Sequence, residues 1–172
     1  MDRRNALTLL SIAMAAPTVA YAKGDMGEAE KEHATETLAM GSVALETARI
    51  AEDKAQNVWV KKFAKYEVAE QTTIAEILKS MGATPAKLTE KQSQMIAKAK
   101  EAKSGPSFDE DFLAGQLDGH RELLKIQETY IGKGKDEAAV GLSKLARAQI
   151  NEHIDLIETI RKDLKGTLPA QP

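Results

Sequence analysis

Two histidines of this 172-residue sequence fall where helical geometry predicts a buried apolar stripe. His120 lies between Leu117 and Leu124, and His153 lies seven residues after Ala146, at spacings that return to the same face of a helix. A buried imidazole without a hydrogen-bond partner destabilises the folded state, so each ring needs a polar partner in the interior. The sequence therefore predicts a polar cluster inside the protein.

Acidic and amide side chains on an earlier segment are the expected partners of these rings. Glu67 and Gln71 fall on the apolar face of that segment, and Glu70 lies at the edge of the same face. Glu52 borders a stripe of small residues further upstream. One interpretation is a hydrogen-bonded structural network that fixes the register of the helices, formed by Glu52, Glu67, Gln71, His120 and His153.

The alternative interpretation is a metal site. Imidazole and carboxylate groups bind divalent metals and iron, and the interiors of helical bundles hold such sites. The ligands would then be His120, His153, Glu67 and Glu70. A complete di-iron centre is not expected, because such centres place a glutamate three residues before a histidine on each of two helices. Leu117 and Ile150 occupy those two positions here.

The one Glu-x-x-His pattern of the sequence is formed by Glu30 and His33. These residues lie close to the expected start of the mature chain, where helix ends fray. We therefore expect both side chains to be solvated and to carry no function.

Prolines and glycines divide the sequence into helical segments, and no stretch alternates with the period of a strand. The predicted helices span residues 28–55, 58–81, 85–102, 107–132 and 136–165. Asn57 is a suitable N-cap for the second helix, and Thr84 followed by Pro85 is a typical start for the third. Ser107 and Glu110 have the spacing of a capping box at the start of the fourth.

These elements predict an all-α protein with one domain. Four amphipathic helices of this length bury their apolar stripes most simply as an antiparallel four-helix bundle, with a short extra helix between the second and third long helices. We expect the bundle domain to span residues 38–165, after a lead-in over residues 23–37 that includes the start of the first helix. A flexible C-terminal tail is expected over residues 166–172.

Residues 1–22 have the pattern of a secretory signal peptide. Arg3 and Arg4 precede a short apolar run, and the small residues around Ala22 fit a cleavage site. We expect a periplasmic or secreted product. The paired arginines also fit the twin-arginine route, which exports folded proteins. No later stretch approaches the roughly 20 apolar residues of a membrane span.

Composition excludes several classes of site and partner. The sequence has no cysteine, which excludes disulfides, thiolate metal sites and iron–sulfur clusters. A formal net charge of −2 is not typical of a nucleic-acid-binding protein.

The single tryptophan, Trp59, is expected to anchor packing together with Phe63. The small-residue face of the first helix favours close packing against another helix, either within the same chain or in a partner, which would be a second copy of the chain or a cell-envelope protein.

Several motifs in order resemble one known family. They are the run Ile50-Ala51-Glu52-Asp53-Lys54-Ala55, then Val60-Lys61-Lys62-Phe63-Ala64, then Phe108-Asp109-Glu110-Asp111-Phe112 leading to His120, and finally Glu152-His153. Over residues 39–161 the chain resembles the exported bacterial domain-of-unknown-function family numbered 4142, which is sometimes described as an outer-membrane protein. The resemblance implies a ferritin-like bundle, an exported location and no assigned activity. That family commonly carries an Asp-His pair where this chain has Glu70-Gln71.

Two functions follow as hypotheses. The first is an exported helical bundle of unknown biochemical role, with no complete catalytic set, that takes part in cell-envelope interactions or stress responses without being an enzyme. The alternative is a metal-binding, ferritin-like bundle with oxidoreductase or metal-storage activity. Its cofactor would be a divalent metal or iron.

Overall fold

The computed structural model describes residues 26–166, and its regular secondary structure is entirely helical over that range. The elements are α1 (Glu28–Lys54), α2 (Val58–Ser80), α3 (Glu90–Glu101), α4 (Pro106–Lys133) and α5 (Glu137–Leu164). The all-α prediction is confirmed for these residues. The expected signal peptide over residues 1–22, with its cleavage position near Ala22, and tail residues 167–172 lie outside the described residues.

Side-chain caps fix where two of the long helices begin. The Asn57 side chain accepts hydrogen bonds from the backbone N–H groups of Trp59 and Val60, at 2.8 and 3.3 Å. This confirms Asn57 as the predicted N-cap of α2. Asp136 accepts a hydrogen bond of 2.8 Å from the Ala139 N–H and begins α5 in the same way. Each cap satisfies N–H groups that have no partner within the helix.

The starts predicted for α3 and α4 are wrong. Helix α3 begins at Glu90 rather than at Pro85, because Thr89 and Gln92 form a reciprocal capping box that satisfies more backbone donors than Thr84 followed by a proline. Helix α4 begins at Pro106 with Gly105 as N-cap and has no side-chain cap, so the predicted box from Ser107 to Glu110 does not form.

Asp109, inside that predicted box, binds the connection between α1 and α2 instead. Its carboxylate accepts hydrogen bonds from the backbone N–H of Gln56 at 3.1 and 3.3 Å and from that of Asn57 at 2.7 Å. Asp109 is 2% exposed. Its carboxylate therefore joins the start of α4 to the turn that positions α2.

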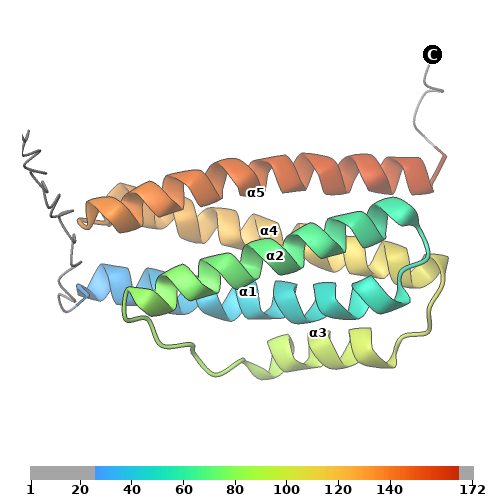
Figure 1. Cartoon of the computed structure of the whole chain (residues 1–172), viewed down its shortest axis with the longest axis horizontal. Coiled ribbons are helices and arrows are strands. Elements are labelled where there is room, and N and C mark those ends of the chain that lie inside the picture. The colour runs from blue at the N-terminus through green and yellow to red at the C-terminus, as the bar shows by residue number, and fades with distance from the viewer. Residues whose placement is uncertain (1–25, 167–172) are drawn as a thin grey trace, which may run out of the picture.

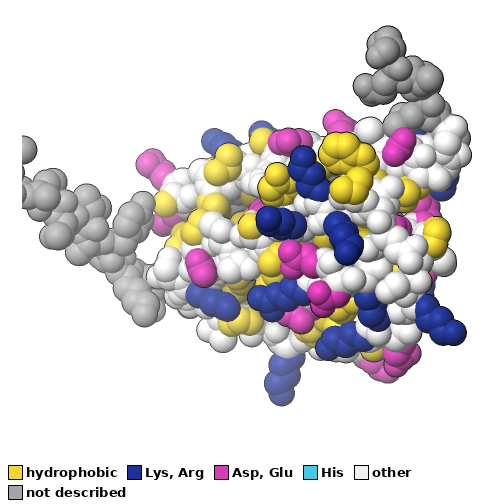
Figure 2. Space-filling view, turned by 45° about the vertical axis from the view of Figure 1, so that its right-hand side comes forward, with side chains coloured by type: hydrophobic (Ala, Val, Ile, Leu, Met, Phe, Trp, Pro, Cys, Tyr) yellow, Lys and Arg dark blue, Asp and Glu magenta, His cyan; other side chains and the backbone are white. Residues whose placement is uncertain are grey.

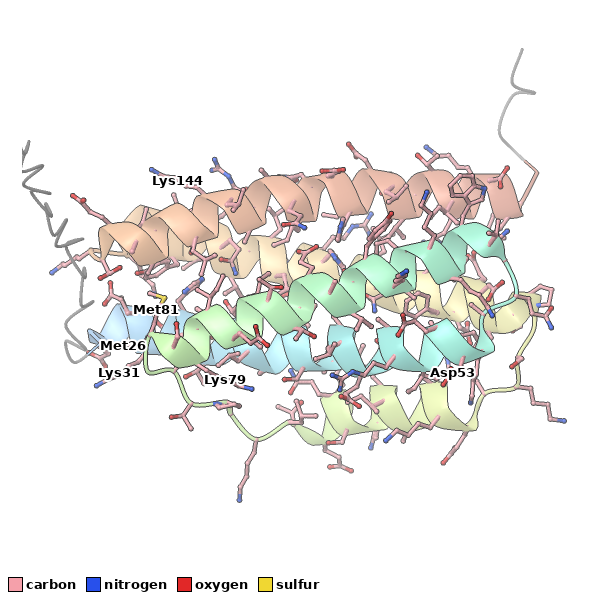
Figure 3. The ribbon with its side chains drawn as sticks, in the orientation of Figure 1. Met26, Lys31, Asp53, Lys79, Met81 and Lys144 are labelled. Carbon is pink, nitrogen blue, oxygen red and sulfur yellow. The ribbon has the colours of Figure 1, made fainter. Side chains whose placement is uncertain are left out.

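The helices lie side by side along the long axis of the molecule, as Figure 1 shows, and pack as helices of a bundle do. Helix α1 packs against α2, α3 and α4, and α4 also packs against α5. The largest core cluster joins the four long helices through residues that include Ala48, Phe63, Phe112 and Ile157. A separate cluster around Leu38 and Leu78 fills the end of the molecule where Met26 and Met81 lie together (Figure 3).

The small residues of α1 pack within the chain. Ala48 and Ala51 are fully buried in the core, and a Cβ atom added at Gly41 would meet the Gln71 Oε1 atom at 2.6 Å. The absence of a side chain at Gly41 thus allows α1 to approach α2. Association with a second copy or another protein stays a prediction.

Trp59 does not anchor the core as expected. Its side chain is 52% exposed and lies beside Lys62, whereas Phe63 is 2% exposed and belongs to the core. Trp59 lies in the first turn of α2, at the end of the helix, whereas Phe63, one turn further along the same face, packs into the core. Figure 2 shows such exposed hydrophobic side chains among charged ones, and no histidine reaches the surface on the face that it presents. None of the helices in residues 26–166 combines the length and apolar character needed to cross a membrane.

Candidate metal centre

Three helices bring a buried carboxylate and two imidazoles together. Glu67 comes from α2, His120 from α4 and His153 from α5. Glu67 and His120 are 0% exposed and His153 is 7% exposed. The prediction that both histidine rings point inward and share a polar cluster is confirmed.

One oxygen of Glu67 faces both rings. Its Oε2 atom lies 3.4 Å from Nε2 of His120 and 3.2 Å from Nδ1 of His153. These two nitrogens are 3.2 Å apart. Three potential ligand atoms therefore form a nearly equilateral triangle in the interior.

The other nitrogen of His120 fixes its ring. Nδ1 of His120 lies 2.7 Å from the backbone carbonyl oxygen of Gln116, one helical turn earlier in α4. Because a carbonyl only accepts, Nδ1 carries the hydrogen and donates it. In the neutral ring, Nε2 then holds a lone pair directed at Glu67 and His153. This is the tautomer and orientation that a metal-binding histidine needs.

Glu67 lacks the hydrogen bonds that a buried carboxylate requires. Neither of its oxygens has a hydrogen-bond partner among the described residues, although both atoms are buried. Burial alone would raise the pKa of Glu67, but the neighbouring imidazoles of His120 and His153 outweigh it and lower the pKa to about 2. The carboxylate is therefore ionised at neutral pH and needs a positive charge beside it.

Electrostatics couple His120 to the same carboxylate. Burial would lower the pKa of His120, but the Glu67 carboxylate outweighs burial and raises it. In the absence of another cation, a proton on the imidazole compensates the charge of Glu67.

Glu70 lies on the outer side of the cluster. Its Oε2 atom is 3.3 Å from Nε2 of His153 and accepts a hydrogen bond of 2.6 Å from the Gln149 side chain. Burial raises the pKa of Glu70 to about 7. Of the two imidazoles, Glu70 lies beside that of His153, at the ring nitrogen Nε2, whereas Glu67 lies beside Nδ1 of the same ring.

A groove between α2 and α5 leads to this part of the cluster. It has a volume of about 780 Å³, and both Glu70 and His153 line it. Exposed hydrophobic side chains line it further out, including Tyr66, Leu145 and Leu156. The groove gives the cluster a route to solvent.

The triangle fits the ligand spacing of a small divalent ion. A tetrahedral ion with metal–ligand bonds of about 2.0–2.1 Å holds its ligand atoms about 3.3–3.4 Å apart. The three separations here are 3.2, 3.2 and 3.4 Å. Two imidazoles and one carboxylate are also the donor set preferred by zinc and by non-haem iron. Glu67, His120 and His153 fit a metal ion in both spacing and chemistry.

Two residues of the predicted polar network lie elsewhere. Glu52 is exposed, because its place at the edge of the α1 stripe turns its side chain outward. Gln71 is buried as predicted, but it lies against Gly41 of α1. No hydrogen bond between Gln71 and the two histidines is found among residues 26–166. The exposure of Glu52 excludes it from a buried network, whereas the place of Gln71 in that network stays a prediction.

A second buried polar cluster was missed. Glu30 and His33, expected to be solvated, are 8% and 4% exposed. The His33 ring stacks on Tyr130 with centroids 4.1 Å apart, and its Nε2 lies 2.8 Å from Gln127 Oε1 and 3.2 Å from Ser143 Oγ. These partners on α4 and α5 bury the first turns of α1, which therefore do not lie at an exposed helix end.

Glu30 closes the end of this second cluster. Its Oε1 atom accepts hydrogen bonds from the Tyr130 hydroxyl at 3.1 Å and from the backbone N–H groups of Lys135 and Asp136 at 3.0 and 3.4 Å. Hydrogen bonding, first of all from the Lys135 N–H, lowers the pKa of Glu30. Glu30 and His33 thus join α1 to the α4–α5 connection, and their polar atoms are engaged in structural hydrogen bonds.

The fold and the site together define an all-helical protein with a buried histidine–carboxylate cluster. A family model described as domain of unknown function (DUF4142) matches residues 15–160, most of the chain, and the chain belongs to this family. No curated protein and no solved structure matches it. The matched range contains the whole cluster, while the description of the family assigns no activity.

Proposed function

We propose that this protein binds one divalent transition metal ion, such as zinc or ferrous iron, through Glu67, His120 and His153. The observation that carries the proposal is the Glu67 Oε2 atom. It is buried, has no hydrogen-bond partner among the described residues and lies 3.4 and 3.2 Å from the two imidazole nitrogens. Glu70, on the groove side of His153, supports that ring as an outer carboxylate.

A metal ion compensates the buried charge more completely than a proton does. A proton occupies one imidazole nitrogen at a time, and Glu67 Oε2 has no hydrogen bond to either ring although both lie at ion-pair distance. An ion would instead engage the lone pairs of all three atoms at once. Uncompensated buried carboxylates are strongly unfavourable, which supports a cation as the native partner of Glu67.

The available ligands favour one ion over two. Two-metal centres in helical bundles draw carboxylates and histidines from all four helices. Here α1 contributes no ligand to the cluster, because Glu52 is exposed and His33 is bonded to Gln127 and Ser143. An ion held by the three residues would supply Lewis-acid chemistry, and iron would add one-electron redox chemistry.

Cobalt(II) titration tests the proposal directly. Purified protein is treated with a chelator, returned to buffer and titrated with Co²⁺ while visible absorption is followed. We expect saturation at one ion per chain and displacement by Zn²⁺. His120→Ala and His153→Ala, which each remove one ligand, are expected to weaken binding by about a hundredfold or more, since even outer-sphere changes cost about 10–100-fold.

His33→Ala is the matched control, because it removes a buried histidine that lies outside the cluster. It is expected to leave Co²⁺ affinity unchanged. Absence of saturable binding would contradict the proposal, and so would an equal loss of affinity in the His33 variant.

The arrangement of the helices supports a finer fold assignment. We propose that the four long helices form an antiparallel four-helix bundle of the ferritin-like type. The packing of α1 on α2, of α1 on α4 and of α4 on α5, with short connections after α1 and α4, supports it. An experimental structure that matches ferritin-like bundles in helix order and direction is the expected result, and a different helix order would contradict it.

We also propose that the protein is exported, with residues 1–22 removed. The positive, apolar and small-residue regions of this segment support the proposal. Mass spectrometry of protein recovered from the periplasm or medium is expected to find a chain beginning near Lys23. Recovery of the intact chain from the cytoplasm alone would contradict export. A role in envelope interactions or stress stays a prediction.

A further inference from the structure

A partly enclosed cavity lies between α1, α3 and α4, apart from the groove beside the metal centre. Its volume is about 310 Å³. Most of its lining is apolar and includes Met40, Val43, Met95 and Phe112. Apolar cavities of about half this volume bind benzene, so this one has room for a molecule of two fused rings.

Small residues of α4 create the space. Gly115 and Gly119 both line the cavity, four residues apart on one face of the helix. A Cβ atom added at either would meet nothing within 4 Å. Helix α3 covers the cavity and is fastened at its C-terminal end, where the Lys54 Nζ donates hydrogen bonds to the carbonyl groups of Ala99 and Ala102 at 3.1 and 2.8 Å.

One polar atom in the lining lacks a partner. Gln116 is 3% exposed, and its Nε2 donates hydrogen bonds to the Ala44 carbonyl oxygen and to Thr47 Oγ1, both at 3.1 Å. Because these bonds use both amide hydrogens, Oε1 is the free end of the side chain. That buried oxygen has no hydrogen-bond partner among the described residues. Gln116 lines the cavity, and a modest rotation of its side chain would turn this buried acceptor toward a ligand there.

We propose that this cavity binds a small, flat, mostly apolar molecule that carries one hydrogen-bond donor, and that the donor bonds to Oε1 of Gln116. The apolar lining supplies affinity, and the acceptor supplies selectivity. The same residue links the cavity to the metal centre, because the Gln116 backbone carbonyl accepts the hydrogen bond from His120 Nδ1. The cavity itself contains none of the proposed metal ligands, so the proposal does not depend on a bound metal.

Indole and indene form a matched pair of probes. They have nearly the same shape, but indole has an N–H group where indene has a CH₂ group. Isothermal titration calorimetry of the purified protein is expected to show one binding site for each. Indole should bind about threefold to tenfold more tightly, which is the effect of one hydrogen bond between neutral groups.

Gly115→Leu is the variant that fills the cavity, and it should weaken indole binding at least tenfold. Because leucine favours helix more than glycine, the variant is expected to fold. Gly132→Leu is its control, since Gly132 lies in the same helix, has open space around it and does not line the cavity. It should bind indole as the wild type does.

Three results would overturn the proposal. They are the absence of saturable indole binding, equal affinity for indole and indene, and unchanged indole binding in Gly115→Leu. Circular dichroism of both glycine variants distinguishes loss of the site from loss of the fold.

Discussion

Replacing Glu67 by glutamine is expected to change the stability of the metal-free protein in opposite directions at acidic and at alkaline pH. Glutamine keeps the shape of the side chain and removes its charge. The carboxylate is ionised at both pH values, because the imidazoles lower its pKa to about 2. What changes with pH is the protonation of its imidazole partner.

The sign follows from His120, whose pKa is raised in the folded protein because the Glu67 carboxylate outweighs burial. A raised pKa contributes stability that is fully present below the unfolded value of about 6.5 and is lost as the pH rises through the folded value. At pH 6 the charged pair is present, and Glu67→Gln should cost about 1–2 kcal/mol.

At a pH above the folded pKa of His120, the wild-type carboxylate is buried without a compensating proton. Glutamine removes that charge, and we expect a gain of about 1–3 kcal/mol in the free energy of unfolding. For a domain of this size, each kcal/mol shifts the melting temperature by about 2–4 °C. The variant should therefore melt below the wild type at pH 6 and above it once the pH exceeds the folded pKa of His120.

Differential scanning calorimetry of chelator-treated protein measures both shifts. Adding Zn²⁺ at about one hundred times its dissociation constant should stabilise the wild type by about 2.7 kcal/mol and leave Glu67→Gln nearly unchanged. A shift of the same sign at both pH values would refute the reasoning, because the carboxylate would then have a partner that does not titrate.

Further predictions concern residues outside the metal centre. His33→Ala should lower the free energy of unfolding by about 2–4 kcal/mol, because it removes a buried ring that stacks and hydrogen-bonds, and urea denaturation measures this loss. Glu30→Gln should reduce the loss of stability in acid. The lowered pKa of Glu30 contributes stability above about pH 4.5, and this contribution disappears as the pH falls through the pKa that Glu30 has in the folded protein. Denaturation at pH 3 and pH 6 tests this expectation. Lys54→Met should speed amide hydrogen exchange in residues 90–101 several-fold with little change in the core, because Lys54 donates hydrogen bonds to the carbonyl groups at the C-terminal end of α3. Unchanged exchange in residues 90–101 would show that Lys54 does not hold the helix.

Helical periodicity was sufficient to predict the centre of the site. His120 and His153 each interrupt a stripe of aliphatic residues, so their inward direction follows from the repeat alone. Glu67 lies on the corresponding face of α2 for the same reason. Glu52 was misplaced because it lies at the edge of its stripe, where a small rotation of the helix decides between interior and solvent.

Contacts between residues far apart in the sequence account for what could not be predicted. The burial of Glu30 and His33 depends on Tyr130 and Gln127, about 100 and 94 positions later. Asp109 accepts hydrogen bonds from backbone groups 52 and 53 positions earlier, which no local capping pattern reveals. The late start of α3 reflects competition between two plausible caps, of which the reciprocal one forms.

Anomalous diffraction from crystals grown with Co²⁺ locates a bound ion most directly. We expect one strong peak per chain, about 2.0–2.2 Å from Glu67 Oε2, His120 Nε2 and His153 Nδ1. Peaks only at surface carboxylates, or beside Glu30 and His33, would contradict a metal centre in this interior cluster.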